Sequence, residues 1–370
     1  MAALIFFIQK LYFILSSAKV RKNQHAHTLL TLRKRKEYAL SANKQSLAYT
    51  DDRNDWIITL YVVAGTGCFF IDNLNTLLVM RALLGVSVGL IMPLSTGLLS
   101  YFYPPEEQAR LMGLSAAMNQ MGGVVGTLLA GVLASIEWNY AFLVYVFGLV
   151  ALFMILRFLP NEKLGLSNKR GKEFELRQLL KFHPSVIGML LLTMVFFVFP
   201  TNFAIITGKQ LGLDTGIITI LMVALDLLAF FVGLVFGKMM GKFRTTIKFF
   251  PPIALMIGYS FYAGASHMAM IVVGSAFIGL ANGVGVPYLM TIASIKGGKN
   301  SATTVMPLLS AALYLGQFIS PIIILPLAET FFGAEDIVGP YKIAVCISVI
   351  FLMQVWATRH FQSLPPVEKS

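Results

Sequence analysis

The chain has 370 residues, of which 57% are hydrophobic and 12% are charged, and its mean hydropathy is +0.75. A water-soluble protein of this composition would expose large apolar patches, so an ordinary soluble domain is excluded. The formal net charge of +12 is strongly basic, but the basic residues lie between apolar blocks, which argues against nucleic-acid binding. Cys68 and Cys346 both lie inside apolar blocks, so neither a disulfide framework nor a CxxC site is available.

Apolar blocks of about 20 residues, the length that crosses a hydrocarbon core as a helix, recur along the chain. They predict an all-α integral membrane protein with ten transmembrane helices. Bounded by Pro, Gly or charged residues, the predicted spans are 55–73, 75–101, 109–133, 138–159, 185–206, 215–237, 247–265, 267–292, 302–326 and 339–359.

Residues 2–18 are apolar but short, and they are interrupted by Gln9 and Lys10. They fit either an eleventh span with an outside N-terminus or a helix that lies at the membrane surface. The sequence predicts five parts in chain order: an atypical basic segment 1–54, an incomplete N-terminal helical half 55–159, a cytoplasmic basic linker 160–183, a C-terminal six-helix half 184–360 and a cytoplasmic tail 361–370.

Lysine and arginine concentrate in every second loop. The segment 19–54, the linker 160–183 and the loop 238–248 hold most of them, whereas the opposite loops hold only Lys209 and Lys342. Because basic loops stay on the cytoplasmic side, this pattern predicts a multi-pass protein of the cell membrane with a cytoplasmic C-terminus.

An internal repeat links the two halves with an offset of 194 residues. The spacing G-x3-G-x3-P occurs in both halves, and the same offset relates a further pair of glycines. The related pairs are Gly85 and Gly279, Gly89 and Gly283, Pro93 and Pro287, and Gly122 and Gly316. Parallel repeats of this kind are one way in which transporters are built, with substrate held between the halves.

The repeat also indicates what the first half lacks. Subtracting the offset from the span 215–237 gives residues 21–43, which are rich in lysine and arginine. Each such residue costs about 2.5 to 3.5 kcal/mol at the centre of an inserted helix, so this segment cannot cross a bilayer. The sequence therefore predicts that a normal first helical pair is missing.

Glycine motifs occur at three places. Residues 113–131 follow G-x8-G-x3-G-P-x2-G-G, except that Thr127 replaces the proline and Ala130 replaces a glycine; residues 81–85 give R-x-x-x-G; and residues 237–244 give G-x-x-x-G-[KR]-x-[RG]. The motif residues are Arg81, Gly85, Gly113, Gly122, Gly126, Gly131, Gly237, Gly241 and Arg244.

With these motifs, residues 55–360 resemble the major facilitator superfamily. The resemblance implies a two-half helical bundle that here has ten helices, or eleven if residues 2–18 cross the bilayer, where the family has twelve. The first two helices are replaced by residues 1–54. The motif at 113–131 is similar to that of the family's antiporters, so the resemblance implies efflux by antiport.

Asp226 lies at the middle of the span 215–237, where an ionised carboxylate is costly in lipid. It is a candidate for proton coupling or for binding a cationic substrate, and the alternative is a carboxylic acid that hydrogen-bonds between helices for packing. Arg81 is the second coupling candidate. Its alternative is a long side chain that snorkels to the interface.

Seven polar residues on apolar helices are candidates for contact with a substrate in a central cavity. The alternative for each of them is a hydrogen bond between helices, worth about 0.6 to 2 kcal/mol. They are Asn119, Gln120, Asn202, Asn282, Tyr288, Tyr314 and Gln317. The glycines of the motifs are expected to allow close helix contact or bending.

The sequence contains no G-x4-G-K-[ST] motif and no H-E-x-x-H or Cys/His cluster, so neither an ATP-driven pump nor a metal enzyme is indicated. No cofactor or metal is expected. The sequence favours a proton-coupled exporter of a small molecule that acts as a monomer in membrane lipid by alternating access. The alternative is a transport-incompetent remnant or a membrane scaffold of the same fold.

Overall fold

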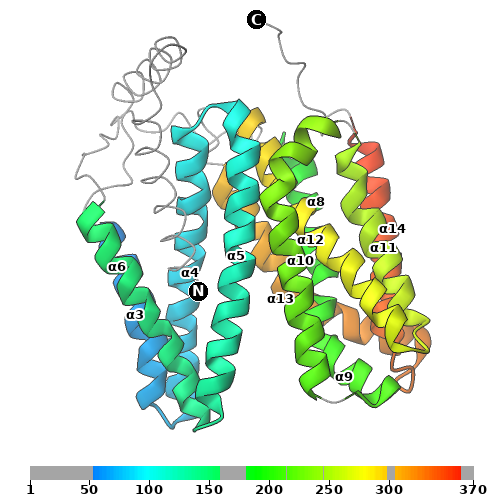
Figure 1. Cartoon of the computed structure of the whole chain (residues 1–370), viewed down its shortest axis with the longest axis horizontal. Helices are drawn as coiled ribbons and strands as arrows, with labels where there is room; N and C mark the ends of the chain where they lie inside the picture. The colour runs from blue at the N-terminus through cyan, green and yellow to red at the C-terminus, as the bar shows by residue number, and fades with distance from the viewer. Residues whose placement is uncertain (1–52, 159–180, 214, 245, 298–304, 360–370) are drawn as a thin grey trace, which may run out of the picture. The chain divides into compact units, whose positions relative to one another are not determined.

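The computed structural model describes residues 53–158, 181–213, 215–244, 246–297 and 305–359 (Figure 1). Every element in these ranges is an α-helix or a 3-10 helix, so the predicted all-α fold is confirmed. The predictions for residues 2–18, and for most of the basic linker, fall outside the described residues.

Contacts between helices divide the described chain into two compact units. The first holds the residues up to Leu98 and those from Val125 to Phe158, and the second holds Leu99–Val124 and the residues from 181 onward. The elements of the first unit are α3 (Arg53–Gly67), η1 (Cys68–Phe70), most of α4 (Leu74–Phe102), the end of α5 (Pro105–Ala134), η2 (Trp138–Val146) and α6 (Phe147–Phe158).

The second unit contains the remainder of α4 and α5 and all later elements. Within it, α10 and α11 both pack on α12, α8 packs on α13, and α14 packs on α11. The later elements are α8 (His183–Phe196), α9 (Val198–Leu211), α10 (Thr215–Lys242), η3 (Ile247–Phe249), α11 (Phe250–Ala263), α12 (Met268–Gly297), α13 (Met306–Phe332) and α14 (Gly339–Ala357).

A helix occupies each of the ten predicted spans. Seven helical stretches in the described chain are long and apolar enough to cross a membrane. The predicted spans 55–73, 138–159 and 247–265 contain shorter helices. The predicted span 302–326 ends too early. Helix α13 passes through Pro326 and continues to Phe332.

The predicted span 185–206 is broken into α8 and α9 at Phe197. Pro200 has no backbone N–H, so it cannot bond to the carbonyl of Phe196 four residues earlier. The buried Tyr259 of α11 compensates, since its hydroxyl donates to the carbonyls of Val195 at 2.7 Å and of Phe196 at 3.3 Å. The break is therefore supported by a neighbouring helix.

The first unit has a small apolar core between α3 and α4, built around Ile58, Tyr61, Leu84 and Ile91. Glycine permits close packing beside it, since a Cβ on Gly148 would lie 2.7 Å from Val62. The core of the second unit includes fully buried tyrosines, which is typical of helices that meet through aromatic rings with a polar end.

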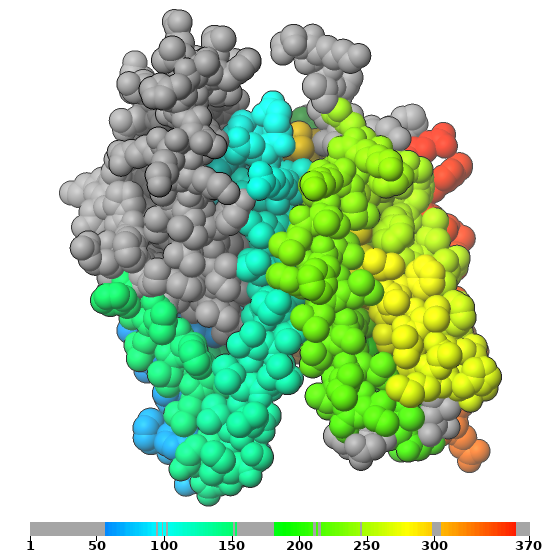
Figure 2. All heavy atoms as spheres, in the orientation of Figure 1, coloured from blue at the N-terminus to red at the C-terminus, as the bar shows by residue number. Residues whose placement is uncertain are grey.

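Apolar side chains also lie on the outer surface of α10, which is coloured light green in the space-filling view (Figure 2). Ile220 is 67% exposed and Phe231 is 59% exposed. In water such a surface would be unfavourable, whereas in a membrane it faces lipid chains at no such cost.

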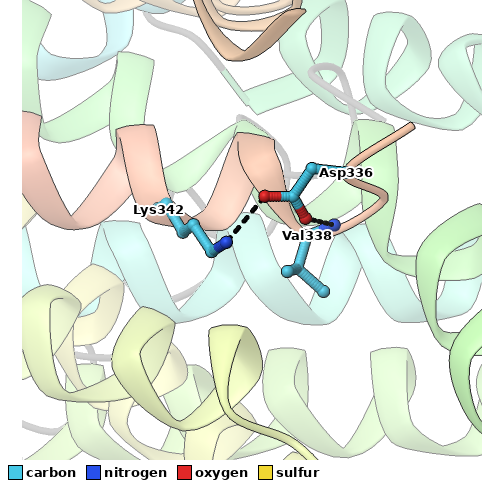
Figure 3. Close-up of polar contacts among 3 residues, drawn as sticks. All are labelled: Asp336, Val338 and Lys342. Carbon is cyan, nitrogen blue, oxygen red and sulfur yellow. Dashed lines mark hydrogen bonds and ion pairs between the residues drawn. The ribbon is translucent and has the colours of Figure 1, made fainter. Parts of the chain in front are cut away.

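The loop between α13 and α14 holds an ion pair. Asp336 accepts a hydrogen bond from the backbone N–H of Val338, near the start of α14, at 3.2 Å, and its other oxygen lies 2.6 Å from Lys342 Nζ (Figure 3). Lys342 is one of the two basic residues on the predicted outer side, and here its charge is paired with a carboxylate.

Candidate functional site

Helix α10 is held closely against α5 by glycines on both helices. A Cβ added to Gly113 of α5 would lie 2.6 Å from the carbonyl oxygen of Gly233, and a Cβ on Gly233 would lie 2.9 Å from that of Gly113. One helical turn further on, a Cβ on Gly237 would lie 2.9 Å from Arg110 Cα. Side chains of any size at these glycines would push the two backbones apart.

Helix α12 approaches α10 in the same way. A Cβ on Gly279 would lie 2.9 Å from the carbonyl oxygen of Leu225, and one on Gly283 would lie 2.9 Å from that of Ala229. Asp226 lies between these two contacts in the sequence of α10. The backbone that carries Asp226 is thus fixed by its neighbours.

Asp226 receives a hydrogen bond from a second helix. Gln120 Nε2 on α5 donates to Asp226 Oδ1 at 3.2 Å, and both side chains are half-buried. A carboxylate can accept several hydrogen bonds, and a neutral amide fills only one position. The remaining positions can take a proton or a hydrogen-bond donor on a ligand. The structure therefore brings two of the predicted site residues together.

Arg81 belongs to the first unit and has an exposed side chain. Its Nη1 donates to the hydroxyl of Tyr145 at 3.2 Å, and its guanidinium carbon lies 4.7 Å from the centre of the Phe142 ring. Both partners are in η2. A cation over an aromatic face is attracted by the ring, so these contacts hold η2 to α4.

The other predicted cavity residues lie in different surroundings. Asn202 bonds within its own helix, to the carbonyl of Val198 at 3.1 Å and to Thr201 Oγ1 at 2.8 Å. Asn282 and Tyr288 of α12 are buried, at 9% and 2% exposure. Asn119 on α5 is exposed, and Tyr314 and Gln317 on α13 are half-buried.

The predicted motif glycines divide by their surroundings. Gly113 and Gly237 make the close contacts given above, and Gly122 is buried and Gly126 half-buried in α5. No described atom lies within 4 Å of a Cβ placed on any of three others, which are Gly85, Gly131 and Gly241. Arg244, which follows α10, is half-buried.

Sequence reasoning missed a buried polar cluster formed by Ser100, Gln108 and Ser294. Hydropathy gives no signal for such a cluster, because small hydroxyl groups are common in apolar helices. The repeat does give one, since Ser100 and Ser294 are separated by the repeat offset of 194 residues.

Within the described ranges, no group of three or more His, Cys, Asp or Glu side chains is placed to bind a metal ion. In the part of the chain that the structure describes, the long apolar helices, the close glycine contacts and the carboxyl–amide pair between α5 and α10 are those of an all-helical, multi-pass membrane protein. Residues 52–321 match the profile of the Major Facilitator Superfamily. The chain belongs to this family, and the resemblance seen in its motifs is confirmed.

Two curated relatives and one solved structure illustrate the likeness. The chain is 26% identical over 103 residues to multidrug resistance protein 3 of Bacillus subtilis, and 26% identical over 137 residues to the riboflavin transporter RibZ of Clostridioides difficile. These matches cover 27% and 36% of this chain, but only 20% and 29% of the length of those relatives.

The crystal structure of the human organic anion transporter MFSD10 (TETRAN) has a similar fold. It matches 96% of this chain and 95% of its own chain with a TM-score of 0.65 and 14% identity. At this identity the comparison shows the fold alone.

Proposed function

We propose that the chain is a secondary transporter that exports a small molecule across the cell membrane in exchange for protons. The observation that carries the proposal is Asp226, a carboxyl group in the middle of a membrane helix, fixed by close helix contacts and hydrogen-bonded by Gln120. An acidic group in such a place is usually functional, because its burial has a cost that packing alone does not offset.

Coupling would arise because a proton and the substrate compete for the carboxyl group of Asp226. When Asp226 carries a proton it is neutral, and it can donate as well as accept a hydrogen bond. When it loses the proton it is an anion that favours a cationic or hydrogen-bond-donating ligand. Binding of one partner then weakens binding of the other, which is the requirement for antiport.

The proposal also covers the direction of transport and the membrane environment of the protein. The relatives are named for multidrug resistance and riboflavin transport, and both names indicate small organic substrates. The antiporter-like glycine motif in α5 favours export. We propose that the protein works as a monomer in lipid, with the C-terminus cytoplasmic, and that Arg81 contributes to coupling by fixing η2.

The test uses purified protein in liposomes with an acidic interior. Riboflavin and the cationic dye ethidium are added outside, because antiport predicts that either probe accumulates as protons leave. Asp226→Asn keeps the shape of the side chain but cannot titrate, so we expect accumulation to fall to the level of empty liposomes. Asp336→Asn, which changes a carboxylate in a loop, is the matched control and should retain accumulation.

Two outcomes would contradict the proposal. Accumulation that is unchanged in Asp226→Asn would remove Asp226 from the coupling step. The absence of gradient-driven flux of any probe by the unmodified protein, in vesicles where the protein is folded, would favour the scaffold alternative.

A further inference from the structure

Three basic side chains gather where α12 and α14 end and α11 begins, all within the second unit. Lys248 lies in η3 just before α11, Lys296 is in the last turn of α12, and Arg359 follows the end of α14. Lys248 Nζ donates to the backbone carbonyl of Arg359 at 2.7 Å, and η3 contacts both α11 and α14. The fold thus brings together three cations that are far apart in the sequence.

The charges in this cluster oppose one another. The guanidinium of Arg359 disfavours the charge of Lys248, and the ammonium of Lys248 disfavours that of Lys296. Lys248 is only 8% exposed. Among the described residues, no ion pair joins a carboxylate to Lys248 or to Arg359. A buried ammonium group without a counter-ion is costly, so an anion bound here would stabilise the cluster.

The surface of α14 that leads to Arg359 is apolar. Ile350, Met353 and Trp356 are 54%, 62% and 61% exposed, and residues three apart are neighbours on a helix. The guanidinium carbon of Arg359 lies 5.0 Å from the centre of the Trp356 ring. Tryptophan is typical of the boundary between the hydrocarbon core and the headgroups. A lipid chain along α14 would therefore place its headgroup beside Arg359.

We propose that Lys248, Lys296 and Arg359 bind the phosphate group of an anionic phospholipid of the inner leaflet, with one acyl chain along the exposed face of α14. Arg359 is exposed and Lys296 half-buried, so these two contact the phosphate oxygens, and the buried Lys248 adds its charge behind them. A guanidinium can bond two oxygens of one phosphate group. The site is independent of the proposed transport and of Asp226.

The test uses Trp356 as a reporter in bilayers. The chain has three tryptophans, so Trp56→Phe with Trp138→Phe leaves Trp356 alone. The bilayers are phosphatidylcholine with a minor fraction of phosphatidylglycerol, and the acyl chains of that fraction carry bromine, which quenches a tryptophan in contact with it. In the comparison bilayers an equal fraction of phosphatidylcholine carries the bromine. Each intensity is divided by that in the same bilayer without bromine.

We expect brominated phosphatidylglycerol to quench Trp356 more strongly than brominated phosphatidylcholine. Adding Lys296→Gln and Arg359→Gln should weaken binding of phosphatidylglycerol roughly 10- to 30-fold, the scale for two basic residues near a membrane surface, and equalise the two lipids. The matched control is Lys238→Gln with Lys242→Gln, which removes the same charge from exposed residues near the end of α10. It should retain the preference.

Three outcomes would overturn the site. The first is equal quenching by the two lipids in the chain with all its basic residues, a comparison that needs no substitution in the cluster. The second is an equal loss of preference in both pairs of variants, because the lipid would then respond only to the overall charge of this side. The third is loss of the preference with inorganic phosphate but not with sodium chloride of equal ionic strength, which would assign the cluster to free phosphate.

Discussion

Several residues make contacts that their neighbours in the sequence do not indicate. Gln120 and Asp226 are 106 positions apart and meet at 3.2 Å, which no periodicity in the sequence could predict. Asp226 itself could be predicted, because a carboxylate inside an apolar span is conspicuous. The partners of Arg81 could not be predicted, since Phe142 and Tyr145 look like ordinary residues of the apolar block 138–159.

Arg81 and Phe142 provide a prediction at this scale. Arg81→Ala loses both the bond to Tyr145 and the cation–aromatic contact, whereas Phe142→Leu loses only the contact. A double-mutant cycle on unfolding in detergent should give a coupling energy of about 0.5 to 1 kcal/mol, the value for exposed pairs of this type. A coupling energy of zero would mean that the guanidinium is held by Tyr145 alone.

At the scale of elements, hydropathy predicts where helices are, because the cost of an unpaired backbone in lipid leaves few alternatives. It does not predict where they break. The interruption at Phe197 depends on Pro200 and on the Tyr259 hydroxyl from another helix. The mean hydropathy of the span gives no sign of either. Glycine spacing predicts close contact, but not which copy of the repeat makes it.

Two equivalent glycines provide the prediction for elements. A Cβ on Gly279 would lie 2.9 Å from a carbonyl of α10, whereas no described atom lies within 4 Å of a Cβ on its counterpart Gly85. Gly279→Ala should therefore destabilise the protein by about 1 to 3 kcal/mol through overpacking. Gly85→Ala should be neutral or stabilising by up to about 1 kcal/mol, because alanine favours helix.

Thermal unfolding of the two variants in the same detergent measures the difference. Equal effects of both substitutions would show that the close approach of α12 to α10 adds little to stability.

At the scale of the whole molecule, the all-helical fold and the family could be predicted from composition and motifs. The repeat offset was visible too, and it relates α4 to α12 almost residue for residue. The contact between Ser100 and Ser294 follows from that offset only once the ends of the helices are known to meet. Sequence similarity between the repeats shows which positions are equivalent. Only the structure shows which of these positions are in contact.

The direction of the chain through the membrane provides the prediction at this scale. Lys209 precedes α10 and Lys238 lies near its end, and both side chains are exposed. Since 28 helical residues extend about 42 Å, the two lie on opposite sides of a bilayer. In intact cells an impermeant maleimide should label Lys209→Cys and leave Lys238→Cys unlabelled. The reverse pattern would mean that the basic loops face outward.

The three side chains that join α4, α5 and α12 carry no charge, and this has a consequence for how the molecule responds to its medium. Salt screens ion pairs but hardly affects hydrogen bonds between buried neutral groups, and hydroxyl and amide groups do not titrate in the physiological range. The contact among these three side chains should thus have the same strength in dilute and concentrated buffer. If protons couple at Asp226 as proposed, the response to acidity arises at that residue and not at these three side chains.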